Sequence, residues 1–111
     1  MPDVQTLGEF EQIVLLAILR LGENAYGVTI REEIIARTER EPSPGALYVT
    51  LDRLEEKGLV RSQFGDPTPQ RGGRAKRFFS VNAKGVESIA RAQRSYQRLM
   101  KGLKLPGVAH A

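Results

Sequence analysis

Apolar residues recur at helical spacing in three consecutive stretches of the first 58 residues, and the pattern then changes to short strands. We predict helices over residues 7–21, 25–38 and 43–57, and strands over residues 59–64 and 76–81. A last helix is predicted from about residue 82 to about residue 103. The order is therefore three helices, a hairpin and one more helix, with no internal repeat.

Three helices followed by a hairpin are typical of the winged helix-turn-helix fold. We expect a mainly α chain with a small β-hairpin. A winged-helix domain would span residues 1–82, a C-terminal dimerisation helix residues 83–104 and a flexible tail residues 105–111. The first helix is apolar nearly all round, which predicts that it serves a core and a second surface.

Residues with strong capping preferences mark the predicted helix ends. The stretch 6–9 fits a capping box at the start of the first helix, and Asn24 is the expected N-cap of the second. Ser43 and Pro44 are the expected N-cap and first residue of the third helix. Gly58 is expected to end that helix in the left-handed conformation that glycine tolerates.

The composition excludes several classes of site. The chain has no cysteine, and its single histidine, His110, lies next to the C-terminus. Disulfides, thiolate metal sites and histidine-based catalysis are therefore excluded, and we expect no metal, no cofactor and no enzyme activity. The longest apolar run, residues 13–19, is far shorter than the roughly 20 residues of a membrane span. No signal peptide precedes it, so we expect a cytoplasmic protein without a membrane partner.

The third predicted helix has one buried and one outward face. If Leu51 faces the core, a rotation of about 100° per residue places Leu47 and Leu54 beside it. The outward face begins with small residues, so its amino end can approach DNA, where the amide dipoles favour phosphate. The net charge of +4 suits such a polyanionic partner. We therefore expect DNA contacts from Ser43, Gly45, Ala46, Tyr48, Val49, Thr50 and Arg53.

Three side chains of this helix have specific expected contacts, and two of them have an alternative. Arg53 can donate two hydrogen bonds to guanine, and Val49 can contact a thymine methyl group. Arg53 can instead pair with Asp52 or Glu56 on a solvated helix face. Tyr48 either reaches a phosphate with its hydroxyl or is a half-buried core tyrosine, and its spacing favours neither role.

The predicted hairpin loop, residues 65–75, is rich in glycine, proline and arginine. Residues 71–77 hold four cations and no acid, and the paired glycines allow the backbone to approach another surface closely. A basic tip suits a narrow minor groove, which attracts arginine, whereas the alternative is a solvated basic surface without a ligand. The candidate DNA contacts here are Arg71, Gly72, Gly73, Arg74, Lys76 and Arg77.

The last predicted helix carries apolar residues at alternating spacings of three and four, with one polar interruption. This seam can pack on the chain's own core. However, a helix of about 20 residues is roughly 30 Å long, which favours pairing with a second copy of the chain. Gln93 would then fix the register of the two helices. The expected dimer contacts are Val86, Ile89, Gln93, Tyr96, Met100 and Leu103.

Several stretches resemble the PadR family of bacterial transcriptional regulators. In the family's order they are LGEFE at residues 7–11, YGV at 26–28, SPGALY at 43–48, LDRLEEKGLV at 51–60 and GGRAKRFF at 72–79. The tyrosine-bearing third helix combined with the Gly-Gly-Arg stretch is the most specific part of the resemblance.

The resemblance implies a winged-helix domain that binds double-stranded DNA and a homodimer formed through the C-terminal helix. It usually implies repression, and family members often respond to a small hydrophobic or aromatic effector. This chain ends after one C-terminal helix and contains no tryptophan, which puts an effector response in doubt. We expect a repressor that binds a pseudo-palindromic operator through helix 43–57 and wing 65–77. The alternative is a winged-helix module for protein–protein interaction.

Overall fold

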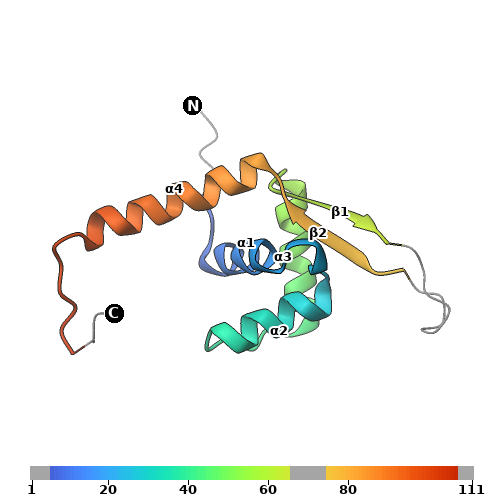
Figure 1. Cartoon of the computed structure of the whole chain (residues 1–111), viewed down its shortest axis with the longest axis horizontal. Coiled ribbons are helices and arrows are strands. Elements are labelled where there is room, and N and C mark those ends of the chain that lie inside the picture. The colour runs from blue at the N-terminus through green and yellow to red at the C-terminus, as the bar shows by residue number, and fades with distance from the viewer. Residues whose placement is uncertain (1–5, 66–74, 108–111) are drawn as a thin grey trace.

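The computed structural model describes residues 6–65 and 75–107 and contains the predicted elements in the predicted order (Figure 1). The fold class is therefore confirmed. No helix in the described ranges is both long and apolar enough to cross a membrane. The elements are α1 (Glu9–Leu21), a 3-10 turn η1 (Gly22–Asn24), α2 (Gly27–Arg37), α3 (Pro44–Glu56), β1 (Val60–Phe64), β2 (Arg77–Val81) and α4 (Ala83–Met100).

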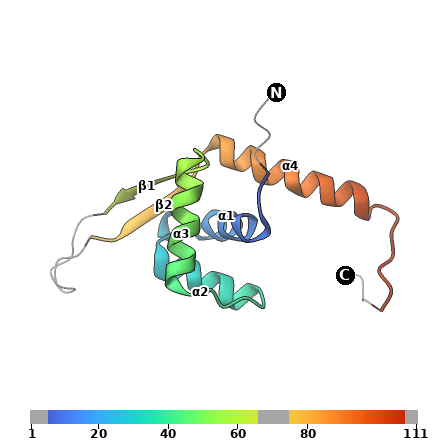
Figure 2. The same cartoon turned by 180° about the vertical axis from the view of Figure 1, so that it is seen from behind.

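The three helices α1, α2 and α3 form a body from which two parts extend in opposite directions (Figures 1 and 2). The hairpin of β1 and β2 extends on one side, and the outer half of α4 extends on the other. The start of α4 lies over α1, with which it is in contact. The molecule therefore has a packed centre and two projecting elements.

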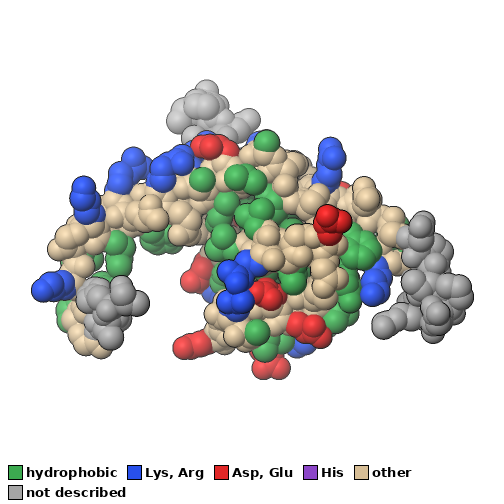
Figure 3. Space-filling view, in the orientation of Figure 1, with side chains coloured by type: hydrophobic (Ala, Val, Ile, Leu, Met, Phe, Trp, Pro, Cys, Tyr) green, Lys and Arg blue, Asp and Glu red, His purple; other side chains and the backbone are tan. Residues whose placement is uncertain are grey.

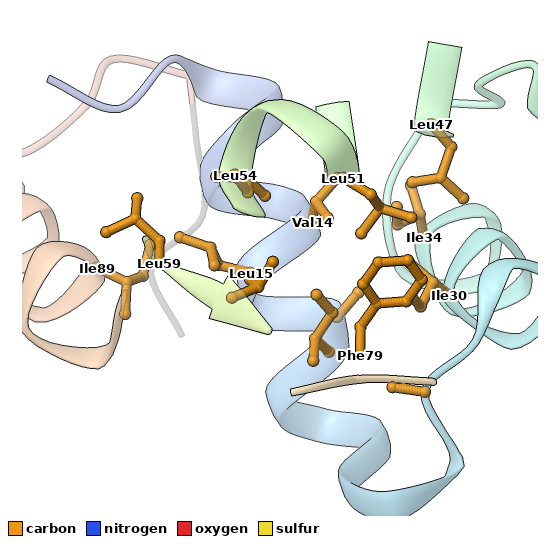
Figure 4. Packing of buried hydrophobic residues seen from close by; sticks show 14 residues of the cluster. Val14, Leu15, Ile30, Ile34, Leu47, Leu51, Leu54, Leu59, Phe79 and Ile89 are labelled. Atoms are coloured by element: carbon orange, nitrogen blue, oxygen red, sulfur yellow. The ribbon is translucent and has the colours of Figure 1, made fainter. Parts of the chain in front are cut away.

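The core lies between α1, α2, α3 and the hairpin (Figure 4). The predicted stripe of α3, Leu47, Leu51 and Leu54, is fully buried, which confirms the orientation of that helix. α1 supplies side chains to this core but leaves Leu16 and Leu19 exposed, as its all-round apolar pattern predicted. The other core side chains labelled in Figure 4 are Val14, Leu15, Ile30, Ile34, Leu59, Phe79 and Ile89.

Two of the predicted helix starts are wrong by two residues. α1 begins at Glu9, and the carboxylate of Glu11 accepts the N–H of Gly8 at 2.8 Å, so residues 6–9 do not form the capping box. The N-cap of α2 is Tyr26 rather than Asn24, and the hydroxyl of Thr29 accepts the N–H of Tyr26. In both cases a polar side chain in the first turn supplies the acceptor.

The predicted ends of α3 are confirmed. The hydroxyl of Ser43 accepts the N–H of Ala46 at 3.1 Å, and Pro44 is the first helical residue. Gly58 has a φ of 77°, so the helix ends where glycine alone turns without strain.

The hairpin is anchored to the helical body at one strand. β1 and β2 pair antiparallel, with Val60 opposite Val81 and Phe64 opposite Arg77. The N–H of Phe79 donates to the carbonyl of Ala25 at 2.8 Å, just before α2. The strands therefore have a fixed position beside the start of α2.

The first half of α4 is packed tightly against the hairpin. The side chain of Asn82 caps the helix by accepting the N–H of Gly85 at 3.1 Å. A Cβ on Gly85 would lie 2.3 Å from the carbonyl oxygen of Leu59, so only glycine fits at this contact. One turn later, Ile89 is 5% exposed and belongs to the core of its own chain. The expectation that Ile89 is a dimer contact is therefore wrong.

A buried carboxylate joins the start of α1 to the end of α3. Besides accepting the N–H of Gly8, Glu11 accepts a hydrogen bond from Lys57 Nζ at 2.8 Å. Burial alone would raise the pKa of Glu11. The two hydrogen bonds and the charges of Lys57 and Arg53 outweigh burial and hold the pKa below its ordinary value.

Candidate nucleic-acid interface

The outward face of α3 is exposed over most of its predicted length, with one exception. Thr50 is only 5% exposed, so the prediction that it can contact a base is wrong. α3 contacts α1, α2 and β1, and a helix packed on several neighbours buries a wider strip than a single leucine stripe. The predicted residues of α3 and its cap that are exposed are Ser43, Gly45, Ala46, Tyr48, Val49 and Arg53.

Arg53 is available on this face. Among the residues that the structure describes, no carboxylate lies within 4.0 Å of its guanidinium, and Asp52 pairs with Arg77 instead. The structure therefore does not support the alternative in which Arg53 pairs with Asp52 or Glu56. An arginine fork exposed in the last turn of α3 has the geometry for bidentate hydrogen bonding.

Tyr48 combines features of both expected roles. Its hydroxyl lies over Gly27 so closely that a Cβ there would be 2.1 Å away. The side chain is nevertheless 40% exposed, so the ring packs at the amino end of α2 without being a core residue. Gly27 was not predicted as a site residue, because nothing in its neighbouring sequence shows which side chain will lie over it.

A shallow cleft of about 420 Å³ lies between the start of α2, α3 and the loop end of the hairpin. Phe64, which is 69% exposed, and Lys76 line its hairpin side, and Tyr48 lines its α3 side. The ammonium of Lys76 lies 4.3 Å from the ring centroid of Tyr26, a cation–π contact. The cleft therefore brings the described end of the predicted wing beside α3. Its lining is Tyr26, Gly27, Val28, Tyr48, Phe64, Ala75, Lys76 and Arg77.

This cleft continues to the amino end of α3. A second, smaller pocket shares Gly27, Val28 and Tyr48 with the cleft and also includes Pro44. Pro44 is the first residue of α3, so one continuous surface runs from that helix start to Lys76. We call this surface, together with Ala46, Val49 and Arg53, the α3–hairpin face.

Arg77 does not have the free guanidinium that the sequence analysis expected. Its terminal nitrogen lies 2.7 Å from the carboxylate of Glu55 and 3.1 Å from that of Asp52. Its Nε donates to the hydroxyl of Ser62 at 3.2 Å, and the guanidinium lies 4.7 Å from the ring centroid of Phe79. These contacts occupy Nε and one terminal nitrogen of Arg77 within the chain, so they favour a structural role for this side chain over the predicted DNA contact.

The remaining predicted wing residues, Arg71, Gly72, Gly73 and Arg74, lie outside the described residues. In the described ranges, no group of three or more acidic, cysteine or histidine side chains has the arrangement of a metal site.

The outer half of α4 presents an amphipathic surface (Figure 3). Hydrophobic side chains lie along its underside, and lysine and arginine side chains lie along the opposite side. Tyr96 is 56% exposed and Met100 is 42% exposed, and Leu99 is more exposed than either. α4 ends at Met100, so Leu103 lies beyond the helix on which the seam was predicted. Of the predicted seam, Val86, Gln93, Tyr96, Met100 and Leu103 are exposed.

Solved structures of winged-helix regulators share this fold. A PadR family regulator from Clostridium difficile has 22% sequence identity and a TM-score of 0.68, over 83% of this chain and 92% of that one. A PadR-like regulator from Bacillus cereus has 18% identity and a TM-score of 0.67, over 83% and 84%. A winged-helix DNA-binding protein from STIV has 18% identity and a TM-score of 0.68, over 90% and 100%. No curated protein matches the sequence.

The family model described as "Transcriptional regulator PadR-like family" matches residues 15–91, which include α2, α3, the hairpin and the packed half of α4. The match thus covers the described α3–hairpin face and most of the chain. The protein therefore belongs to the PadR-like family of transcriptional regulators, and it is a winged-helix regulator rather than an enzyme.

Proposed function

We propose that the protein is a repressor that binds a pseudo-palindromic operator as a homodimer. The observation that carries this proposal lies in the α3–hairpin face, where the start of α3 and Tyr48 share one continuous surface with Lys76 at the loop end of the hairpin. A recognition helix and a wing must meet the same DNA segment, so they have to lie on one side of the domain. Repression rather than activation is proposed because the PadR resemblance usually implies it.

Within this face we assign base reading to α3. Ala46 and Gly45 are small and exposed, so the amino end of α3 can enter the major groove without a bulky side chain in the way. Arg53 would donate two hydrogen bonds to a guanine, and Val49 would contact a thymine methyl group. These contacts give sequence preference, because each base pair presents a different pattern in the major groove.

The hairpin and the tyrosine beside it would hold the DNA backbone and minor groove. Lys76 presents a charge at the loop end of the hairpin, and the hydroxyl of Tyr48 lies at the amino end of α2, where a phosphate is favoured. Arg71 and Arg74, with Gly72 and Gly73 beside them, are proposed to enter the minor groove. These contacts would raise affinity for all sequences.

A dimer would form through the apolar underside of α4. The proposed contacts are Val86, Gln93, Tyr96, Met100 and Leu103, which are exposed in the single chain. A two-fold axis would place two copies of α3 in successive major grooves, about 34 Å apart. Each operator half-site would then be read by one subunit.

The test is selection of bound duplexes from random DNA, combined with light scattering to measure the mass of the free protein. We expect enrichment of a two-fold symmetric sequence and the mass of two chains. If the dimer contacts about 8 phosphates, the logarithm of affinity should fall with the logarithm of salt concentration at a slope near −7. Absence of an enriched sequence would contradict specific binding and would favour the protein–protein interaction module.

Two substitutions separate the proposed roles. Arg53→Ala should change which sequence is enriched, because it removes a base contact. Arg74→Ala should weaken binding to every sequence and make the salt slope less steep by about 1 per lost phosphate contact. Equal losses of affinity on all sequences for both variants would contradict this division between α3 and the wing.

A further inference from the structure

Arg77 links three elements from the loop end of the hairpin. It is the first residue of β2, its guanidinium contacts Asp52 and Glu55 of α3, and its Nε donates to Ser62 of β1. The hydroxyl of Ser62 also donates to the carboxylate of Glu55, at 2.9 Å to one oxygen. The four side chains therefore form one connected group, which we call the Arg77 bracket.

The bracket has the geometry of a rigid joint. The guanidinium is planar and offers its donors in fixed directions, so simultaneous bonds to α3 and β1 restrict the angle between those elements. The ring of Phe79, which is buried in the core, supports the guanidinium from one side. The side chains of Arg77 and Glu55 are 26% and 36% exposed, so their ion pair is partly shielded from water, whereas Asp52 is 60% exposed.

The bracket lies directly beside the α3–hairpin face. Arg77 follows Lys76 in the chain and lines the same cleft as Tyr48 and Phe64. A change in the angle between α3 and the strands would therefore move the wing relative to the bases that α3 contacts. The free protein already holds this angle, which lowers the entropy that binding would otherwise cost.

We infer that Arg77 is a positioning residue that holds the hairpin at a fixed angle to α3, so that α3 and the wing engage their DNA grooves in one register. This inference rests on the proposed function for its consequence, but the geometric part concerns the free protein. Arg77 acts through Asp52, Glu55 and Ser62, and its guanidinium does not contact DNA.

Binding measurements distinguish positioning from a phosphate contact. The probes are the duplex enriched by the unaltered chain and a scrambled duplex of equal length. Arg77→Ala should lower the ratio of specific to non-specific affinity about tenfold while leaving the salt slope unchanged. A direct phosphate contact would instead lower both affinities and make the slope less steep by about 1 per contact. That second result would overturn the inference.

A matched pair of variants controls for charge and for folding. Arg61→Ala removes an exposed arginine from β1 of the same hairpin and should leave the specificity ratio unchanged. Arg77→Lys keeps the charge but loses the planar guanidinium, so it should restore only part of the ratio of specific to non-specific affinity that Arg77→Ala loses. A full recovery by lysine would show that charge alone matters and would contradict the positioning role. Circular dichroism verifies that each variant remains folded.

A measurement without DNA tests the geometry by itself. The chain has no cysteine, so Val49→Cys on α3 and Gln63→Cys on β1, both exposed positions, can carry a pair of spin labels. The distance distribution between the labels should be narrow in the unaltered background and clearly broader with Arg77→Ala. Equal widths would overturn the inference even if DNA binding occurs. A chain that enriches no sequence would instead refute the proposed function, and the label distances would still decide the role of Arg77.

Discussion

The two halves of α4 have the same apolar spacing but different surroundings. In the first half, Gly85 touches the backbone of Leu59 and Ile89 is buried in the core. In the second half, Tyr96 and Met100 are exposed and the helix extends away from the body (Figures 1 and 3). One continuous apolar seam in the sequence thus packs against the chain's own core in its first half and stays exposed in its second half. Helical spacing shows that a face is apolar, but it does not show which surface covers that face.

Ile89→Ala should give the largest loss of stability, because it leaves a cavity in the packed half of α4. We expect the free energy of unfolding to fall by about 2 to 4 kcal/mol, as measured by urea denaturation. The control is Leu99→Ala in the outer half, where the side chain is 78% exposed and the loss should stay below about 0.5 kcal/mol. Equal losses of unfolding free energy for the two variants would contradict the difference in packing between the two halves of α4.

Gly85→Ala should destabilise the protein although alanine normally favours a helix. The added Cβ would meet the carbonyl oxygen of Leu59 at 2.3 Å, and a backbone atom cannot move aside easily. We expect the free energy of unfolding, measured by thermal denaturation, to fall by about 1 to 3 kcal/mol. Gly45→Ala is the control, since a Cβ there meets nothing within 4 Å. This substitution should raise the free energy of unfolding by up to about 1 kcal/mol. A stabilising Gly85→Ala would show that α4 does not pack as described.

Glu11→Gln should lower the free energy of unfolding by about 1 to 2 kcal/mol near pH 7, because it removes the negative charge from the buried, hydrogen-bonded pair of Glu11 and Lys57. The pKa of Glu11 is lowered in the folded state. The charge of Glu11 therefore stabilises the fold fully above the unfolded-state pKa of about 4.3. This stabilisation is lost as the pH falls through the lower pKa of the folded state.

Urea denaturation at a series of pH values checks this expectation. The difference in stability between the unaltered chain and Glu11→Gln should shrink steadily as the pH falls below about 5. Glu9→Gln is the control, since Glu9 is exposed and should show a small difference at every pH. A difference for Glu11→Gln that does not depend on pH would contradict the role of its charge.

Tyr96→Glu should give the smallest effect on the fold and a large effect on association. The side chain is exposed in the single chain, so the free energy of unfolding per chain should change by less than about 0.5 kcal/mol. Sedimentation should instead show a shift from two chains to one, because a charge in an apolar interface is costly. Gln97→Glu, off the seam, should leave the mass unchanged. Unchanged association in both variants would place the dimer contact elsewhere.

The fold was predictable where the local pattern sufficed. The buried stripe of α3 follows from its leucine spacing, and its ends follow from Ser43, Pro44 and Gly58. The first-turn acceptors Glu11 and Thr29 were missed, because several polar residues near each helix start have suitable spacing. Only the backbone geometry shows which of them reaches the free N–H.

The candidate site was predictable in part. The outward side of α3 was recovered except for Thr50, which is buried because α3 packs against several elements at once. Arg77 was counted among the free cations, since its carboxylate partners on α3 lie more than 20 positions away in the sequence. Gly27 and Phe64 enter the site only through packing between elements that are distant in the chain.

The most direct test of the α3–hairpin face is an NMR titration of the ¹⁵N-labelled protein with its selected duplex. We expect the largest amide shifts along residues 45–53 of α3 and at Lys76, with small shifts at Leu19 and Arg20 at the carboxyl end of α1. Shifts centred on the outer half of α4 or on α1, with α3 unaffected, would contradict the claim that this face reads DNA.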